Sequence, residues 1–221
     1  MNAKFQLWIG FLLIVLLGAA CDFQTPTPAP VNPQFASPGA TLFADDFSNF
    51  SSWGMWSGDG AVVDYYTGGL RILVQEAQYD FWSVPGLEFN DVDIEVNAVK
   101  LGGPDDNDFG LICRYQNKDN FYMLVISSDG YYGIAKIKNG QYILLGADQL
   151  QYSNSIALGQ AANNIRAECV GPNLRLYANS VLLTEVQDGD FPSGDVGLVA
   201  GTYNTPGTDI LFDNFIVRKP Q

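Results

Sequence analysis

Hydrophobic and polar residues follow a strand-like pattern from about residue 41 to the end of the chain. Apolar residues come in short runs or alternate with polar residues, and Gly, Asn and Asp separate the runs. Residues 91–99 (DVDIEVNAV) alternate with a period of two, as a strand with one buried face does. No segment has the apolar spacing of a long helix, although residues 147–158 fit a short helix or an irregular loop. The pattern predicts one antiparallel β-sandwich or barrel over residues 41–221.

Residues that favour tight turns lie between several of the apolar runs. Asp129-Gly130 and Asn139-Gly140 supply the positive φ angles that two-residue hairpin turns need. Gly171-Pro172-Asn173 indicates a further turn. We therefore expect hairpins at the first two places and a change of chain direction at the third.

The period-two alternation assigns residues to the two faces of each predicted strand. In residues 91–99, the apolar face carries Val92, Ile94, Val96 and Ala98, and the opposite face carries Asp91, Asp93 and Glu95. Cys113 lies in the apolar phase of residues 109–115 (FGLICRY), with Arg114 on the opposite face. Cys169 lies in the apolar phase of residues 164–170 (NIRAECV). Both cysteines are therefore expected in the core.

The N-terminal segment has the features of an export signal. Lys4 precedes an apolar run over residues 7–20, which is short for a spanning helix of ~20 residues. The run ends in small residues directly before Cys21, which resembles the lipobox of bacterial lipoproteins. The resemblance implies removal of residues 1–20, acylation of Cys21 and attachment to the extracytoplasmic face of the membrane. The alternative is an ordinary signal peptide in which Cys21 is incidental.

Residues 21–40 predict a tether between this anchor and the domain. The segment lacks charge after Asp22 and is rich in proline, at Pro26, Pro28, Pro30, Pro33 and Pro38. Proline fixes φ and favours an extended, semi-rigid spacer, although a disordered linker would behave similarly.

Cysteine number and compartment predict one disulfide. The chain has three cysteines, and lipidation of Cys21 leaves Cys113 and Cys169. Export to an oxidising space and a shared apolar phase favour a bond between them. The alternative is a pair of free, buried cysteines.

Composition excludes several classes of function. The chain has no His, which excludes a Ser-His-Asp triad, a Cys-His pair and a His-bound metal. Its formal net charge of −13 argues against nucleic acid, whose phosphates are bound by clustered Lys and Arg.

Several segments together resemble the concanavalin A-like jelly rolls. The superfamily includes laminin-G-like domains, legume-type lectins, glycoside hydrolase family 16 and the bacterial 3-keto-disaccharide hydrolase-like domain. The segments that carry the resemblance are residues 43–47 (FADDF), 109–137, 166–179 (RAECVGPNLRLYAN), 194–201 (GDVGLVAG) and 212–217 (FDNFIV). The resemblance implies an all-β, antiparallel sandwich. It does not imply one function, because such folds include enzymes, lectins and adhesion modules.

Asp91, Asp93 and Glu95 are the candidate catalytic residues. They resemble the Glu-x-Asp-x-Glu motif of family 16, in which the outer residues are nucleophile and acid/base. Here the first position is Asp91, whose side chain is shorter than that of Glu. Positions i and i+4 of a strand lie ~13 Å apart, whereas a retaining pair needs its carboxyl groups within ~5–5.5 Å. Two long Glu side chains can lean across this gap, but the shorter side chain of Asp91 reaches less far. The preferred interpretation is an acidic, solvent-facing stripe on a half-buried strand.

A second set of residues predicts a ligand site. Aromatic rings stack on the C–H faces of sugars, and polar groups bind the hydroxyls. The predicted ligand-binding residues on a concave face are Tyr66, Trp82, Arg114, Tyr122 and Tyr132. The alternative is that these residues pack in the core and turns.

A structural Ca²⁺ is the one candidate cofactor. Carboxylates are its preferred ligands, and the resemblance places such an ion where the first and last strands meet. Asp46 and Asp213 are the predicted ligands. The cluster Asp105, Asp106, Asn107 and Asp108 is a second option, but its spacing favours an Asx-rich turn.

These inferences predict a membrane-anchored lipoprotein whose domain binds a glycan or another extracellular ligand without catalysis. One alternative is a sugar-active hydrolase that uses Asp91, Asp93 and Glu95. Another is a structural domain that binds proteins.

Overall fold

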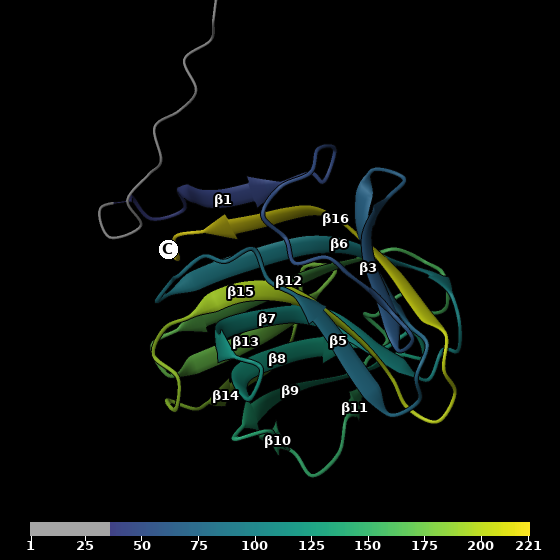
Figure 1. Cartoon of the computed structure of the whole chain (residues 1–221). Helices are drawn as coiled ribbons and strands as arrows, with labels where there is room; N and C mark the ends of the chain where they lie inside the picture. The colour runs from purple at the N-terminus through teal and green to yellow at the C-terminus, as the bar shows by residue number, and fades with distance from the viewer. Residues whose placement is uncertain (1–35) are drawn as a thin grey trace, which may run out of the picture. The chain divides into compact units, whose positions relative to one another are not determined.

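Two antiparallel β-sheets pack face to face in the computed structural model, which describes residues 36–221 (Figure 1). The described residues form sixteen strands, and none of them belongs to a helix that could cross a membrane. The predicted antiparallel β-sandwich is confirmed. The predicted signal peptide, Cys21 and most of the predicted tether lie outside the described residues.

The larger sheet has nine strands and the smaller sheet has seven. In spatial order, the larger sheet contains β14 (Val181–Gln187), β13 (Asn173–Ala178), β12 (Asn163–Val170), β6 (Val92–Gly102), β16 (Thr208–Arg218), β4 (Gly69–Val74), β3 (Ala61–Tyr66) and β2 (Trp56–Gly58), with β1 (Thr41–Asp45) also paired to β16. The smaller sheet contains β10 (Gln141–Leu145), β9 (Tyr131–Lys138), β8 (Asn120–Ile126), β7 (Asn107–Asn117), β15 (Asp195–Thr202) and β5 (Tyr79–Ser83), with β11 (Gln151–Tyr152) paired to β9.

The main core lies between the sheets and follows the predicted alternation. Val92, Ile94, Val96 and Ala98 of β6 are buried there, and the residues between them face away from the core. The facing sheet contributes alternate residues of β7, β8 and β15 to the same cluster. The hydrophobic effect is the main contribution that holds the two sheets together, because each strand buries its apolar face between them.

The predicted disulfide is confirmed, and it joins the two sheets. Cys113 belongs to β7 of the smaller sheet, and Cys169 belongs to β12 of the larger sheet. Both residues are fully buried, in agreement with their apolar phase.

The smaller sheet also carries apolar residues on the face that points away from the main core. Ile112, Phe121, Met123, Val125 and Val199 form a second buried cluster there, covered in part by Trp82, Tyr115 and Ile137. Residues 121–126 of β8 are therefore all buried, on one face or the other, which explains their continuous apolar run in the sequence. This outer face is the surface on which the candidate site is built.

Candidate functional site

Two aspartates from different strands of the smaller sheet meet over a glycine. Gly201 of β15 is paired with Asp80 of β5 on one side and with Asp108 of β7 on the other. Paired residues point to the same face of a sheet, so all three lie on the outer face. A Cβ atom on Gly201 would collide with the Oδ1 atoms of both aspartates. The glycine therefore leaves the space in which the two carboxyl groups face each other.

Asp108 is almost completely buried, with 4% of its surface exposed. The Tyr203 hydroxyl donates a hydrogen bond to its Oδ2 atom at 3.3 Å, but no described residue hydrogen-bonds to its Oδ1 atom. Burial, and then the charge of Asp80, raise the pKa of Asp108 well above its usual range. Burial also raises the pKa of Asp80 to about 6. The pair therefore resists carrying two negative charges at once.

A cavity of about 600 Å³ lies over this pair. Its walls come from the loop between β10 and β11 and from the loop between β15 and β16. The first loop belongs to the segment for which the sequence left a short helix or an irregular loop open, and in the structure it is a loop. The lining residues are Gln78, Asp80, Asp108, Tyr142, Leu144, Asp148, Gln149, Leu150, Thr202, Tyr203 and Asn204.

A second cavity of about 460 Å³ adjoins the first. The two share four lining residues, two from each loop, and the second adds Asp106, Ser127, Asp129 and Tyr131 among others. Among the described residues that line either cavity, every charged side chain is an aspartate. We call the two cavities together the acidic groove. Its charge disfavours anionic ligands and suits neutral or cationic ones.

Tyr142 gives the acidic groove an accessible aromatic ring. The residue extends from β10 at the sheet edge, and 48% of its surface is exposed. Partial burial, and then the carboxyl groups of Asp108 and Asp80, raise its pKa to about 12. Its hydroxyl therefore stays protonated at neutral pH and can donate a hydrogen bond.

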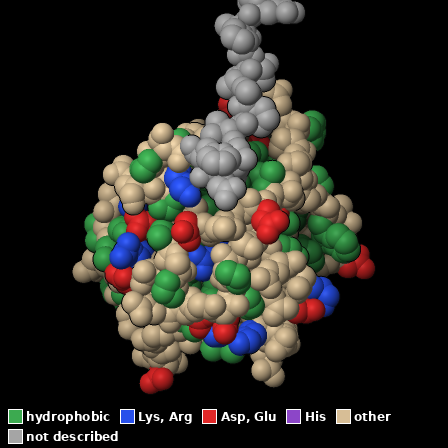
Figure 2. Space-filling view, turned by 90° about the vertical axis from the view of Figure 1, so that its left-hand side faces the viewer, with side chains coloured by type: hydrophobic (Ala, Val, Ile, Leu, Met, Phe, Trp, Pro, Cys, Tyr) green, Lys and Arg blue, Asp and Glu red, His purple; other side chains and the backbone are tan. Residues whose placement is uncertain are grey.

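The three candidate catalytic carboxylates lie elsewhere, on the outer face of the larger sheet or at its margin. Each contacts an arginine: Asp91 pairs with Arg114 at 3.3 Å, Asp93 with Arg166 at 2.8 Å and Glu95 with Arg218 at 2.6 Å. Partial burial opposes ionisation of Glu95, but hydrogen bonds from Arg218 and Asn164 lower its pKa overall. Figure 2 shows acidic and basic side chains next to one another on the face that it presents, as expected for a surface with such ion pairs.

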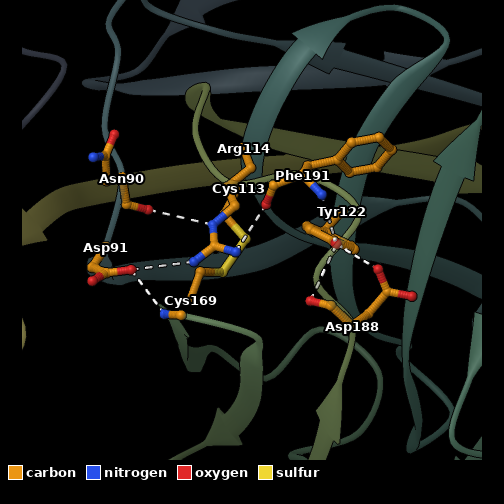
Figure 3. Close-up of a disulfide and its surroundings, with 9 residues drawn as sticks. Asn90, Asp91, Cys113, Arg114, Tyr122, Cys169, Asp188 and Phe191 are labelled. Atoms are coloured by element: carbon orange, nitrogen blue, oxygen red, sulfur yellow. Dashed lines mark hydrogen bonds and ion pairs between the residues drawn. A yellow bond between two sulfur atoms is a disulfide. The ribbon is translucent and has the colours of Figure 1, made fainter.

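Arg114 and Tyr122, two of the predicted ligand residues, have structural partners (Figure 3). Arg114 has only 2% of its surface exposed, and it donates hydrogen bonds to the carbonyl oxygens of Asn90 and Phe191. Tyr122 is fully buried between the sheets and donates to Asp188 Oδ1 at 2.6 Å. Both lie beside the disulfide, where they connect the loop before β15 to the core.

The other three predicted ligand residues lie in three different environments. Tyr132 packs in the main core. Trp82 is half-buried on the outer face of the smaller sheet, with its ring centroid 5.2 Å from that of Phe121. Tyr66 is exposed on the larger sheet, where the Arg71 guanidinium lies 4.6 Å from its ring centroid. The structure therefore does not bring the five predicted ligand residues together.

Asp46 and Asp213, the predicted calcium ligands, each accept hydrogen bonds from neighbours in the sequence. Asp46 accepts from the backbone and hydroxyl of Ser48, and Asp213 accepts from Asn214. The part of the chain that the structure describes holds no group of three or more Cys, Asp and Glu placed for a metal ion. In the second predicted cluster, Asp105 pairs with Lys100, whereas Asp108 joins the acidic groove.

Sequence reasoning did not identify the pairing of Asp80 with Asp108. Asp80 lies in the segment 79–83 (YDFWS), between Tyr79 and Phe81. By the alternation of a strand, its side chain shares a face with Trp82 and not with the core residue Phe81. That phase indicates an outward-facing strand position. The partner could not be found in this way, because β5, β7 and β15 are distant in the sequence and neighbours only in the sheet.

Comparisons with known proteins support the fold and leave the family open. No family model and no curated protein matches the sequence. The structure is similar to a carbohydrate-binding module, CBM66, from Bacillus subtilis, with a TM-score of 0.61, 16% identity, and coverage of 77% of this chain and 97% of that one. It is similar to a protein of unknown function with a galectin-like fold from the same organism, with a TM-score of 0.61, 13% identity, and coverage of 83% and 97%. It is also similar to a β-glucanase from Bacillus licheniformis, with a TM-score of 0.56, 11% identity, and coverage of 81% and 98%. The described domain therefore has the jelly-roll fold that carbohydrate-binding modules and glycoside hydrolases share.

Proposed function

We propose that this protein is a membrane-anchored, extracytoplasmic lipoprotein whose jelly roll binds a carbohydrate in the acidic groove. The observation that carries the proposal is the groove itself, in which an exposed tyrosine ring lies near buried carboxyl groups on the outer face of one sheet. The similarity of the fold to a carbohydrate-binding module and to a β-glucanase supports the same class of ligand.

The residues of the groove match the chemistry of an uncharged sugar. A sugar ring offers apolar C–H faces to an aromatic ring such as that of Tyr142. Its hydroxyls offer donors and acceptors to the amides of Gln149 and Asn204 and to the carboxyl group of Asp80. Uronic acids and sulfated sugars would meet like charge from the aspartates. We therefore expect a neutral glycan.

Two features favour binding over hydrolysis. The candidate catalytic residues Asp91, Asp93 and Glu95 lie away from the groove, and each is paired with an arginine. Asp80 and Asp108 face each other across a gap of about one Cβ atom. A retaining glycosidase holds its carboxyl groups ~5–5.5 Å apart, and an inverting one holds them farther apart. The two Oδ1 atoms lie 2.0 and 2.2 Å from the position that a Cβ on Gly201 would take, so they are closer together than either class of enzyme requires.

Replacing the exposed tyrosine of the groove tests the proposal. We expect Tyr142→Ala to weaken binding to the best ligand on a neutral-glycan array by at least about tenfold, because the stacking surface is lost. Tyr66→Ala is the matched control, since Tyr66 is 43% exposed but lies on the other sheet. Titration calorimetry with the purified full chain measures both variants.

Two results would contradict this assignment. Loss of binding in Tyr66→Ala with retention in Tyr142→Ala would move the ligand site to the larger sheet. An array without any ligand would instead favour the alternative of a domain that binds proteins.

The lipid anchor is tested separately at Cys21. We expect Cys21→Ser to abolish incorporation of an alkyne-labelled fatty acid, because serine offers no thiol for the diacylglyceryl group. The variant should also leave the membrane fraction, while Cys113→Ala/Cys169→Ala should keep the label. Labelling that persists in Cys21→Ser would place the acyl group at another site, and an unaltered protein that takes up no label would indicate an ordinary signal peptide in which Cys21 is incidental.

A further inference from the structure

The carboxyl groups of Asp80 and Asp108 have no counter-charge among the described residues that line the acidic groove. Burial of a carboxylate is costly unless a cation or several donors compensate it. Asp188 is compensated by Lys136 and Tyr122, and the buried Asp195 accepts hydrogen bonds from backbone N–H groups of Gly86 and Val196. In the acidic groove, by contrast, no Lys or Arg is present among the described lining residues.

One oxygen atom of the pair is both buried and unused. No residue between 36 and 221 hydrogen-bonds to Asp108 Oδ1, although Oδ2 of the same group accepts from Tyr203. The free oxygen points toward the space over Gly201, where Oδ1 of Asp80 also lies. Two carboxylate oxygens therefore face one gap, and this gap opens to the cavity of about 600 Å³.

We propose that Asp80 and Asp108 bind a divalent metal cation, with the properties of Ca²⁺, in the acidic groove over Gly201. A cation between the two oxygens compensates both charges and supplies the missing partner of Asp108 Oδ1. The available ligands are carboxyl and hydroxyl oxygens, which select hard cations such as Ca²⁺ over the softer transition metals. Water molecules complete the coordination on the open side of the cavity.

The expected affinity is modest, because the protein supplies few ligands. Extracellular calcium modules with few charged ligands bind with dissociation constants of about 10⁻⁴–10⁻³ M. An ion held in this way keeps exchangeable water ligands that face the groove. The inference does not rest on the proposed carbohydrate function, because ion binding is measured without any glycan.

Titration of the purified full chain with CaCl₂ at pH 7.5, after removal of metal with EDTA, tests the site. Calorimetry should show saturable binding of one ion, and Tb³⁺ should give luminescence sensitised through the tyrosines of the groove. We expect Asp80→Asn and Asp108→Asn each to weaken binding at least about tenfold. Asp213→Asn, at the predicted strand-end calcium site, is the matched control and should bind as the unaltered protein does.

Other outcomes overturn the proposal. It fails if the unaltered protein binds no Ca²⁺ at millimolar concentration, or if both Asn variants retain binding. Loss of binding in Asp213→Asn alone would place the ion between β1 and β16 instead. Thermal melting shows whether each variant is folded, and Gly201→Ala provides a second probe, because its methyl group enters the gap without altering charge. A folded Gly201→Ala that binds Ca²⁺ normally would also contradict the site.

Discussion

Removing the disulfide through Cys113→Ala/Cys169→Ala is expected to lower the free energy of unfolding by ~4 kcal/mol in the chain-entropy model. The bond joins residues that are 56 positions apart, so its loss frees a long loop in the unfolded chain. It also joins β7 to β12, which otherwise meet only through packing between the sheets. For a domain of this size, the change corresponds to a melting temperature lower by ~10 °C.

Urea denaturation of the double variant and of the unaltered protein, with and without a reductant, measures this effect. The unaltered protein unfolded and refolded in the reductant should reach the lower stability of the variant. Equal stabilities in all samples would show that packing between the sheets alone holds the sandwich together.

Replacing the groove carboxylate in Asp80→Asn is expected to stabilise the metal-free protein at pH 7.5 by up to about 3 kcal/mol. Burial raises the pKa of Asp80 to about 6. A carboxyl group with a raised pKa contributes its stability below its unfolded-state pKa and loses it as the pH rises through the folded-state value. The gain in the variant should therefore be near zero at pH 4 and should grow between pH 4 and about 6.

Asp188→Asn is the matched control with the opposite sign. Burial opposes its ionisation, but hydrogen bonds from Lys136 and Tyr122 lower the pKa of Asp188 overall. Its stabilising contribution is present above the unfolded-state pKa and is lost as the pH falls. Urea denaturation from pH 4 to 7.5 in EDTA should thus show Asp188→Asn destabilised at neutral pH. A difference for Asp80→Asn that does not change with pH would contradict the buried carboxyl pair.

Local patterns were sufficient to predict much of the fold. The alternation in β6 identified which residues enter the core, and the same reasoning placed Cys113 and Cys169 on facing sides. Asn139 and Gly140 both adopt positive φ, of 54° and 76°, in the turn between β9 and β10. Each of these features depends on residues close together in the chain or on the period of a single strand.

The candidate site could not be predicted in this way, because it depends on contacts between distant segments. Arg114 lies beside the disulfide, and the sequence does not reveal that Asn90 and Phe191 would enclose its guanidinium. The continuous apolar run of β8 does not indicate which of its two buried faces Tyr122 occupies. The facing of Asp80 and Asp108 depends on β15 lying between their strands.

The pairing of β1 with β16 determines how mechanical force reaches the domain. Any pull on the N-terminal segment is transmitted first to β1, which is held to β16 by a ladder from Thr41 opposite Arg218 to Asp45 opposite Phe215. Phe43 adds an aromatic contact with Phe215, at 6.2 Å between ring centroids. Because β1 pairs with β16 alone among the described strands, it can peel away under tension while the cross-linked sheets and the groove on the far layer keep their shape.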